Sequence, residues 1–166
     1  MITDYKEIEL HDDSFGNDLT IPQLFQRVRR HLEECHFQDQ KDVNWLPCHA
    51  IDLAPHGELN AHVDSIKFSG DIVSGLSLLS PSIMRLIPDQ ATYQDYQEPV
   101  PTGWVDLYLP PLSLYALTGV SRYRYSHELL PSGRTFSSSD RSEVRVVDRT
   151  HRLSVIFRDA KLSTES

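Results

Sequence analysis

The sequence has few of the features that cross-link a chain or anchor it to a membrane. Its two cysteines, Cys35 and Cys48, fit neither a disulfide framework nor a zinc-binding spacing, so we expect two free thiols in a reducing compartment. No apolar run approaches the length of a membrane-spanning helix. The first residues are rich in acids and lack the arginine-rich, amphipathic pattern of a transit peptide. At 166 residues, the chain is predicted to form one domain.

Basic residues are also scarce relative to acidic ones. The chain has 24 aspartates and glutamates against 16 lysines and arginines, which gives a formal net charge of −8. A protein that binds nucleic acid through its phosphates usually presents a basic face. The composition therefore does not support a nucleic-acid partner. The one basic cluster, Arg27, Arg29 and Arg30, is predicted to be the solvated face of a helix, and an RNA-binding patch is the alternative.

What the chain does contain is a His-x-Asp pair, His62 and Asp64, in a stretch of alternating residues. On an extended strand these two side chains project to the same side, as two ligands of one metal would. Iron(II) is commonly held by two histidines and one carboxylate, and His127 in the alternating segment 122–128 is the candidate for the second histidine. The pair alone is a weak signal, because a surface turn or a hydrogen-bonded histidine explains most such pairs.

The segment 149–158 adds two arginines to this pattern. Arg152 and Arg158 are predicted to share one face of a strand, with apolar side chains on the other face. Guanidinium groups that point into a protein need anionic partners, because a desolvated charge without one is costly. A dicarboxylate bound beside the metal would supply the anion, and an arginine can bind a carboxylate in bidentate geometry.

Taken in order, these residues resemble the AlkB family of iron(II)- and 2-oxoglutarate-dependent dioxygenases. The resemblance rests on His62-x-Asp64, the distal His127 and the Arg-x5-Arg strand, and it covers roughly residues 48–160. Longer segments narrow it to the mitochondrial branch, represented by the seventh mammalian AlkB homologue. These segments are 62–68, 75–86, 113–119 and 122–128.

The resemblance implies that His62, Asp64 and His127 bind iron(II). It also implies a reaction that consumes O2 and 2-oxoglutarate and hydroxylates a C–H bond, or demethylates when the hydroxylated carbon is bound to nitrogen. No catalytic residue is expected beyond the ligands of the metal and of the cosubstrate.

The 2-oxoglutarate site is expected to consist of Tyr115, Arg152 and Arg158. The resemblance implies that Tyr115 and Arg152 hold the distal carboxylate and that Arg158 acts beside Asp64 and the cosubstrate. Nucleic-acid-directed relatives use an asparagine and a tyrosine where this chain has Ile51 and Leu53, which cannot donate a hydrogen bond. In the mitochondrial branch, a tyrosine from a later strand binds 2-oxoglutarate in their place, and the resemblance puts Tyr115 at that position.

The expected fold class is mainly β, a double-stranded β-helix or jelly-roll with a helix packed outside it. The helix is predicted to begin with Thr20 as N-cap and Gln23 closing a capping box, and to end near Cys35. Tyr123 and Tyr125 are predicted to share the strand face of His127, either lining the pocket or packing in the core. About eight strands are expected, in 4–10, 48–53, 71–79, 83–87, 104–109, 112–117, 122–130 and 149–158, with surface loops at 88–103 and at 131–148, the latter bordering the pocket mouth.

Three functions are weighed for the domain 1–166, which we expect to be a monomer lacking the targeting segment and first elements of its relatives. The first is a hydroxylase of a protein or small molecule, which the resemblance places in the mitochondrial matrix and links to fatty-acid metabolism and programmed necrosis. The second is an RNA N-demethylase acting on mitochondrial transcripts. The third is a metal-containing binding module without catalysis.

Overall fold

The computed structural model describes residues 2–37 and 43–161; residues 1, 38–42 and 162–166 of the predicted domain lie outside the described residues. No helix among the described residues is long and apolar enough to cross a membrane. The elements are β1 (Ile2–Leu10), the 3-10 turn η1 (Asp12–Phe15), α1 (Thr20–His36), β2 (Cys48–His62), β3 (Ser69–Leu79), β4 (Ser82–Pro88), α2 (Gln90–Asp95), β5 (Val105–Leu109), β6 (Ser113–Thr118), α3 (Gly119–Tyr123), β7 (Tyr125–Leu129), β8 (Arg134–Ser137), β9 (Val144–Val147) and β10 (Arg152–Ala160).

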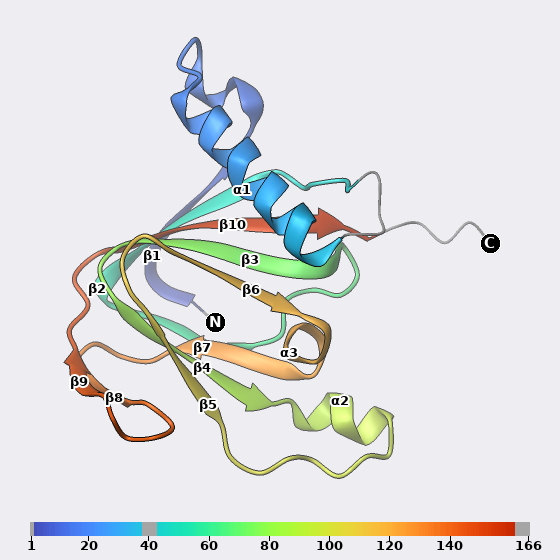
Figure 1. The fold of residues 1–166 in the computed structure, drawn as a ribbon, viewed down its shortest axis with the longest axis vertical. Helices are drawn as coiled ribbons and strands as arrows, with labels where there is room; N and C mark the ends of the chain where they lie inside the picture. The colour runs from blue at the N-terminus through green and yellow to red at the C-terminus, as the bar shows by residue number, and fades with distance from the viewer. Residues whose placement is uncertain (1, 38–42, 162–166) are drawn as a thin grey trace.

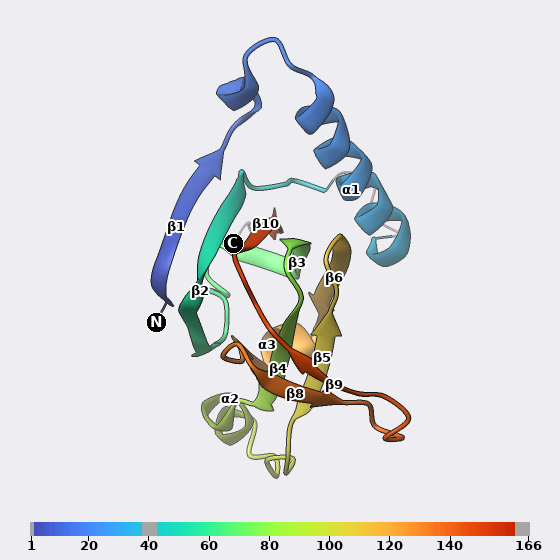
Figure 2. The ribbon, with the colours of Figure 1, turned by 90° about the vertical axis from the view of Figure 1, so that its left-hand side faces the viewer.

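One curved antiparallel sheet forms the body of the protein, with strand order β5-β4-β7-β2-β10-β3-β6 and with β1 paired to β2. The long strand β2 connects two layers, because its first part pairs with β10 and its last part with β7. Figure 1 shows β10, β3 and β6 above β7, β4 and β5, and Figure 2 shows the same layers from the side. This arrangement confirms the predicted mainly β, jelly-roll class.

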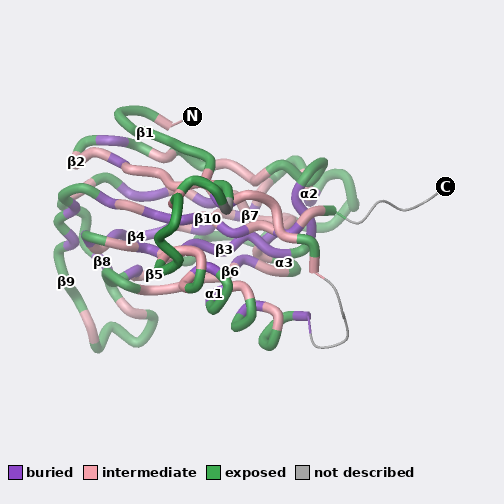
Figure 3. Tube along the Cα trace, turned by 90° about the horizontal axis from the view of Figure 1, so that it is seen from above, coloured by how far each residue is buried: buried purple, intermediate pink, exposed green. Residues whose placement is uncertain are grey.

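Helix α1 covers the outer face of the β10–β3 layer, as its apolar periodicity predicts. Phe25, Val28 and Leu32 pack against Ile72 of β3 and Phe157 of β10, both of which are fully buried. The burial colours in Figure 3 separate this covered layer from β1, which is exposed along most of its length. Because α1 covers the outer face of β10, the opposite face of this strand lines the space between the two layers.

The start of α1 differs from the prediction in its capping. The helix begins at Thr20, but its N-cap is Leu19 and no side-chain cap bond forms. Asp18 Oδ1 instead accepts a hydrogen bond of 2.8 Å from the amide of Thr20. Because Thr20 is already the first helical residue, the predicted capping box with Gln23 is wrong.

Both predicted surface loops contain regular structure. The segment 88–103 holds α2, whose Tyr93 is buried. The segment 131–148 holds the antiparallel hairpin β8–β9, and its Phe136 and Val147 pack against Ile83 of β4. The hairpin forms because its strands bury one face on β4 while the other stays in solvent, a pattern too short for the sequence to reveal.

The predicted strand 122–130 is a short helix followed by a strand. Arg122 and Tyr123 belong to α3, and β7 begins at Tyr125. The hydroxyl of Tyr123 lies 2.7 Å from Asp71 Oδ1, to which it donates, so Tyr123 does not share a strand face with His127. Tyr125 packs against the apolar cluster between the two layers, which is the core alternative for that residue.

Candidate active site

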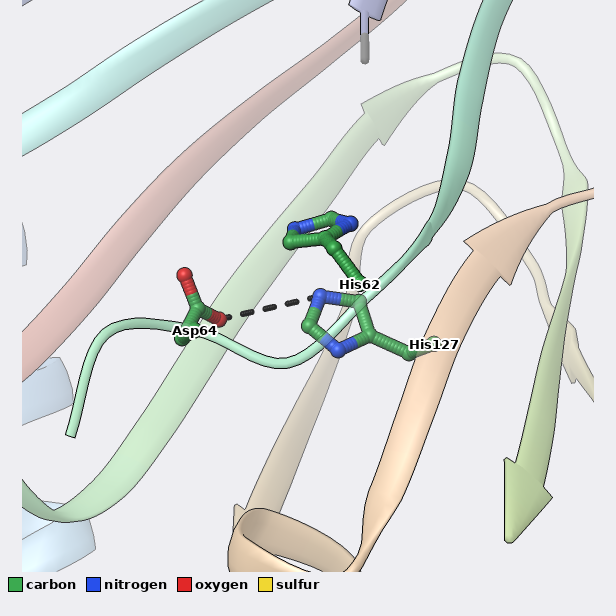
Figure 4. A group of neighbouring side chains, drawn as sticks. All are labelled: His62, Asp64 and His127. Carbon is green, nitrogen blue, oxygen red and sulfur yellow. Dashed lines mark ion pairs between the residues drawn. The ribbon is translucent and has the colours of Figure 1, made fainter. Parts of the chain in front are cut away.

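The pairing of β2 with β7 brings two histidines together. His62, the last residue of β2, lies directly opposite His127 of β7 in the antiparallel register. Facing side chains of paired strands project to the same side of the sheet. The two imidazole rings are 4.3 Å apart between centroids, at an interplanar angle of 50° (Figure 4). A strand register thus joins two histidines that are far apart in the sequence.

The ring orientation of His62 is fixed by its own strand. Its Nδ1 lies 2.8 Å from the carbonyl oxygen of Asn60. A carbonyl can only accept a hydrogen bond, so Nδ1 carries a hydrogen and Nε2 is the ring nitrogen left for another partner. This is the arrangement in which a histidine presents Nε2 to a metal.

Asp64 lies beyond the end of β2, in the irregular segment 63–65 that leads into a turn at 66–68, so the prediction that it shares a regular strand with His62 is wrong. This connection is held by Arg122, which is 2% exposed and donates to the carbonyl oxygens of Asp64 and Ser65 at 3.0 and 3.2 Å. The same guanidinium donates to Ser69 Oγ at 2.9 Å. Arg122 therefore positions the Asp64 carboxylate, a role that its place in the sequence did not indicate.

The three predicted metal ligands meet at one point. His62, Asp64 and His127 each offer one ligand atom, and these atoms all lie within 4.8 Å of one another. Asp64 Oδ2 is 3.7 Å from His127 Nε2, the contact drawn in Figure 4. Burial, reinforced by His62, lowers the pKa of His127 to about 4, so its ring is neutral at neutral pH. Neutral imidazoles and a carboxylate are the ligand forms that bind a divalent metal.

At the other end of the same cavity lies Arg152, which is 3% exposed. It begins β10, and its Nε donates to Ser82 Oγ at 3.1 Å. Its Nη2 is buried and has no hydrogen-bond partner among the described residues. Burial lowers the pKa of Arg152 and raises the pKa of the neighbouring Tyr115, whose phenol opposes the shift on the arginine.

Tyr115 reaches this position because its cross-strand partner on β3 is a glycine. Gly75 lies opposite Tyr115 in the β3–β6 register. A Cβ atom at Gly75 would overlap the ring of Tyr115. Gly75 therefore makes room for the tyrosine, and the only sequence signal for it was a glycine inside a strand pattern.

Arg158 lies beside Asp64, at the end of the cavity that holds the His-Asp-His cluster. Its Nη1 is 3.8 Å from Asp64 Oδ1, and its Nε is buried without a partner among the described residues. It lies on the same face of β10 as Arg152 and Ser154, as predicted. The opposite face carries Val155 and Phe157, which pack under α1.

All six predicted ligands line one cavity of about 140 Å³. Its walls include Ile51 and Leu53, the two positions where nucleic-acid-directed relatives have polar side chains. His49 and Glu7, 2.7 Å apart, also line it and were not predicted. Tyr123 and the segment 131–148 are absent from the lining residues, which corrects the predictions that either borders this pocket.

Comparison with known proteins relates the sequence to one group. No family model matches it. The chain is 44% identical over 112 residues to the mouse "Alpha-ketoglutarate-dependent dioxygenase alkB homolog 7, mitochondrial", covering 68% of this chain and 44% of the relative. The bovine protein of the same name is 44% identical over 110 residues, covering 66% of this chain and 43% of the relative. The chain thus spans less than half the length of these relatives. The predicted resemblance to mitochondrial AlkB-like dioxygenases is confirmed.

Two solved structures share the fold at low sequence identity. A prolyl-4-hydroxylase from Pseudomonas putida aligns with a TM-score of 0.52 and 14% identity, covering 96% of this chain and 72% of the other. OsALKBH1 aligns with a TM-score of 0.56 and 13% identity, covering 95% and 80%. At this level of identity, the match concerns the arrangement of the strands alone.

Proposed function

We propose that this chain is an iron(II)- and 2-oxoglutarate-dependent dioxygenase of the mitochondrial AlkB-like branch. The observation that carries the proposal is one cavity that holds a His-Asp-His cluster at one end and, at the other, the buried guanidinium of Arg152, whose Nη2 lacks a partner among the described residues. The two mammalian relatives are both named as alpha-ketoglutarate-dependent dioxygenases, which supports the same activity for this chain.

The residues present fit both groups that this activity requires. Two neutral imidazoles and one carboxylate, gathered on one side of a site, are the ligands typical of non-haem iron(II) oxygenases. A buried arginine with a free donor fits a carboxylate, which would supply the missing acceptor and the missing negative charge. When bound, the iron and 2-oxoglutarate together supply the oxidising chemistry that inserts one atom of O2 into a C–H bond.

We assign the following roles to the side chains of the site. His62, Asp64 and His127 hold the metal, and the buried Arg152 binds the distal carboxylate of 2-oxoglutarate together with the hydroxyl of Tyr115. Because burial raises the pKa of Tyr115, its phenol keeps its proton and donates to an anion.

The guanidinium of Arg158, whose Nη1 is 3.8 Å from Asp64 Oδ1, stabilises the negative charge of the Asp64 carboxylate. Apolar walls from Ile51, Leu53 and Met84 exclude water between the two ends, which strengthens each of these polar contacts.

A second cavity supports a protein or small molecule as the primary substrate. It measures about 570 Å³ and shares one lining residue, Asp64, with the first cavity. Its walls carry charges of both signs, including Lys67 and Asp95, and its Arg124 is already paired with Glu98. A chain of phosphates would need several free cations here. The mixed charge therefore favours a polypeptide or a small polar molecule over RNA.

The proposal also covers the cellular location of the protein and the biological process in which it acts. Both are named mitochondrial, and we extend this to the matrix for the present chain. Roles in fatty-acid metabolism and programmed necrosis belong to the same proposal and rest on resemblance to that branch. We also propose that residues 1–166 act as a single, monomeric dioxygenase domain.

The test is conversion of 2-oxoglutarate to succinate by purified, iron-loaded protein with ascorbate, compared between the wild type and His62→Ala. Iron-dependent succinate formation in the wild type and its loss in the variant are expected. His31→Ala is the matched control, because His31 lies on the exposed side of α1 and outside the cavity. Equal turnover in the wild type and His62→Ala, or none in folded iron-loaded wild type, would contradict the proposal.

A further inference from the structure

Two arginines line the cavity, and they differ in which part of the guanidinium is held by the protein. Arg152 donates from Nε to Ser82 Oγ at 3.1 Å, and its Nη2 is buried without a partner among the described residues. Arg158 shows the opposite pattern, because its Nε is buried without such a partner and its Nη1 lies 3.8 Å from Asp64 Oδ1. Only Arg152 thus combines a held Nε with a free Nη nitrogen.

Ser82 is fixed in position by the strand that it begins. It is the first residue of β4, is 2% exposed, and pairs with Leu109 of β5 in the antiparallel register. Because side chains alternate along a strand, Ser82 shares a face with Met84, which lines the cavity, whereas Ile83 packs against the hairpin β8–β9. The hydrogen bond from Arg152 to Ser82 therefore joins β10 in one layer to β4 in the other.

A second buried serine holds the main chain at the same place. Ser80, in the connection between β3 and β4, is 4% exposed, and its Oγ donates to the carbonyl oxygen of His151 at 2.8 Å. Leu79 of β3 pairs with Arg152 in the strand register. The main chain at the start of β10 is thus held without Ser82, and the hydrogen bond from Ser82 acts on the side chain of Arg152.

Occupying Nε has a consequence for how Arg152 meets an anion. A carboxylate can bind a guanidinium in bidentate fashion at two edges, one formed by Nε and Nη2 and the other by the two Nη nitrogens. Since Ser82 accepts from Nε, the edge that remains complete is the pair of Nη nitrogens at the end of the side chain. Holding the guanidinium in advance also spares the ligand the entropic cost of ordering a flexible side chain.

We propose that Ser82 is a positioning residue for the cosubstrate, which holds the Arg152 guanidinium so that its two Nη nitrogens face the distal carboxylate of 2-oxoglutarate. The proposal rests on the proposed 2-oxoglutarate site. Ser82 is not among the residues that line the cavity, so it acts through Arg152 and not by contact with the ligand. Its effect is therefore confined to ligands that carry a distal carboxylate.

The experiment compares 2-oxoglutarate with 2-oxobutanoate, which keeps the 1-carboxylate and the 2-oxo group and lacks the distal carboxylate. Calorimetry measures the binding of each acid to Mn(II)-loaded protein, and the readout is the ratio of the two affinities. Ser82→Ala removes the acceptor, and Ser82→Cys replaces it by a thiol of similar shape that accepts hydrogen bonds only weakly. Ser80→Ala is the matched control, because it removes a buried serine hydrogen bond next to β4 without touching the guanidinium.

We expect the affinity for 2-oxoglutarate, relative to that for 2-oxobutanoate, to fall about three- to tenfold in both Ser82 variants. This is the size expected when binding must order one arginine side chain. The affinity for 2-oxobutanoate itself should stay within about twofold of wild type in both variants, because this acid does not reach Arg152. The affinity ratio in Ser80→Ala should also stay within about twofold of wild type.

A purely structural role for Ser82 predicts a different result. If the hydrogen bond only holds the two layers together, its loss would lower stability and weaken both acids equally or neither. A ratio in Ser82→Ala within about twofold of wild type would therefore overturn the inference. A fall of equal size in Ser80→Ala would also overturn it, because a general loosening of the connection between β3 and β4 would then explain the effect.

Two further outcomes are decided in advance. If Ser82→Ala fails to fold, Ser82→Cys carries the test, and a wild-type ratio in that variant contradicts the inference. Wild-type protein that binds neither 2-oxo acid refutes the proposed function itself, so failure of that proposal is distinguishable from failure of the inference.

Discussion

Replacing Arg152 by methionine should lower the affinity for 2-oxoglutarate without lowering the stability of the ligand-free protein. The guanidinium is 3% exposed, donates once to Ser82 Oγ and leaves Nη2 without a partner. In the ligand-free protein, the substitution removes a hydrogen bond worth about 1 kcal/mol and a buried charge whose replacement by an apolar side chain stabilises by about 1–4 kcal/mol. The free energy of unfolding should therefore be unchanged or rise by up to about 3 kcal/mol.

Affinity for 2-oxoglutarate should fall in the same variant. Removing one partner of a buried ion pair costs about 3–5 kcal/mol, because the other charge stays buried and unpaired. Since each 1.4 kcal/mol is a factor of ten, the loss should be about 100- to 4,000-fold. Calorimetric titration of Mn(II)-loaded protein measures the affinity, and thermal unfolding of the ligand-free protein measures the stability.

Arg85→Met is the matched control for this experiment. Arg85 donates from Nε and Nη2 to Asp106 at 2.7 and 2.8 Å and lies outside the cavity. Its loss should lower stability, because Asp106 is left unpaired, and should leave 2-oxoglutarate affinity unchanged. An Arg152→Met protein that binds 2-oxoglutarate within about threefold of wild type would refute the assignment of β10 as the cosubstrate strand.

Three further substitutions test the supporting residues. Arg122→Lys should weaken metal binding about 10- to 100-fold, because the connection that carries Asp64 loses its two-carbonyl clamp, and equal Mn(II) affinity would contradict this. Gly75→Ala should lower 2-oxoglutarate affinity with little effect on metal affinity, because the new Cβ displaces Tyr115; a change in metal affinity alone would be inconsistent with that role. Burial raises the pKa of Tyr123 from its usual value of 10.0 to about 12, so the folded state retains a proton that the unfolded state loses above pH 10. The stability that this group contributes is complete below pH 10 and is lost as the pH rises towards 12. The free energy of unfolding, measured with urea, should therefore fall more between pH 9 and pH 11.5 in the wild type than in Tyr123→Phe. Identical pH dependences in the two proteins would argue against this reasoning.

Features that depend on a local repeat were predictable from the sequence. The apolar spacing of α1 identified the face that packs on β3 and β10, and alternation along 152–158 separated the arginine face from the buried face. These predictions hold because a helix or strand repeats its geometry along the chain. The metal ligands were found through motif order, since no local rule says that His62 and His127 face each other across β2 and β7.

Features that depend on contacts between distant segments were missed. Arg122 acts on a connection 57 or 58 residues earlier in the chain, and Gly75 matters because of a ring on a neighbouring strand. The hairpin β8–β9 and the helix α2 were mistaken for loops because each is short and buries few apolar side chains, Phe136 and Val147 in the hairpin and Tyr93 in α2. Tertiary packing decides such elements more than intrinsic propensity does.

The most direct test of the central claim is an anaerobic titration of the purified chain with iron(II) and then 2-oxoglutarate, monitored by visible absorption. Chelation of the metal by the 1-carboxylate and 2-oxo group gives a weak charge-transfer band. We predict the band in the wild type, its absence in His127→Ala, and its appearance only at much higher 2-oxoglutarate concentration in Arg152→Met. A folded wild-type protein that binds iron(II) without developing the band would contradict the assignment of this cavity as a 2-oxoglutarate dioxygenase site.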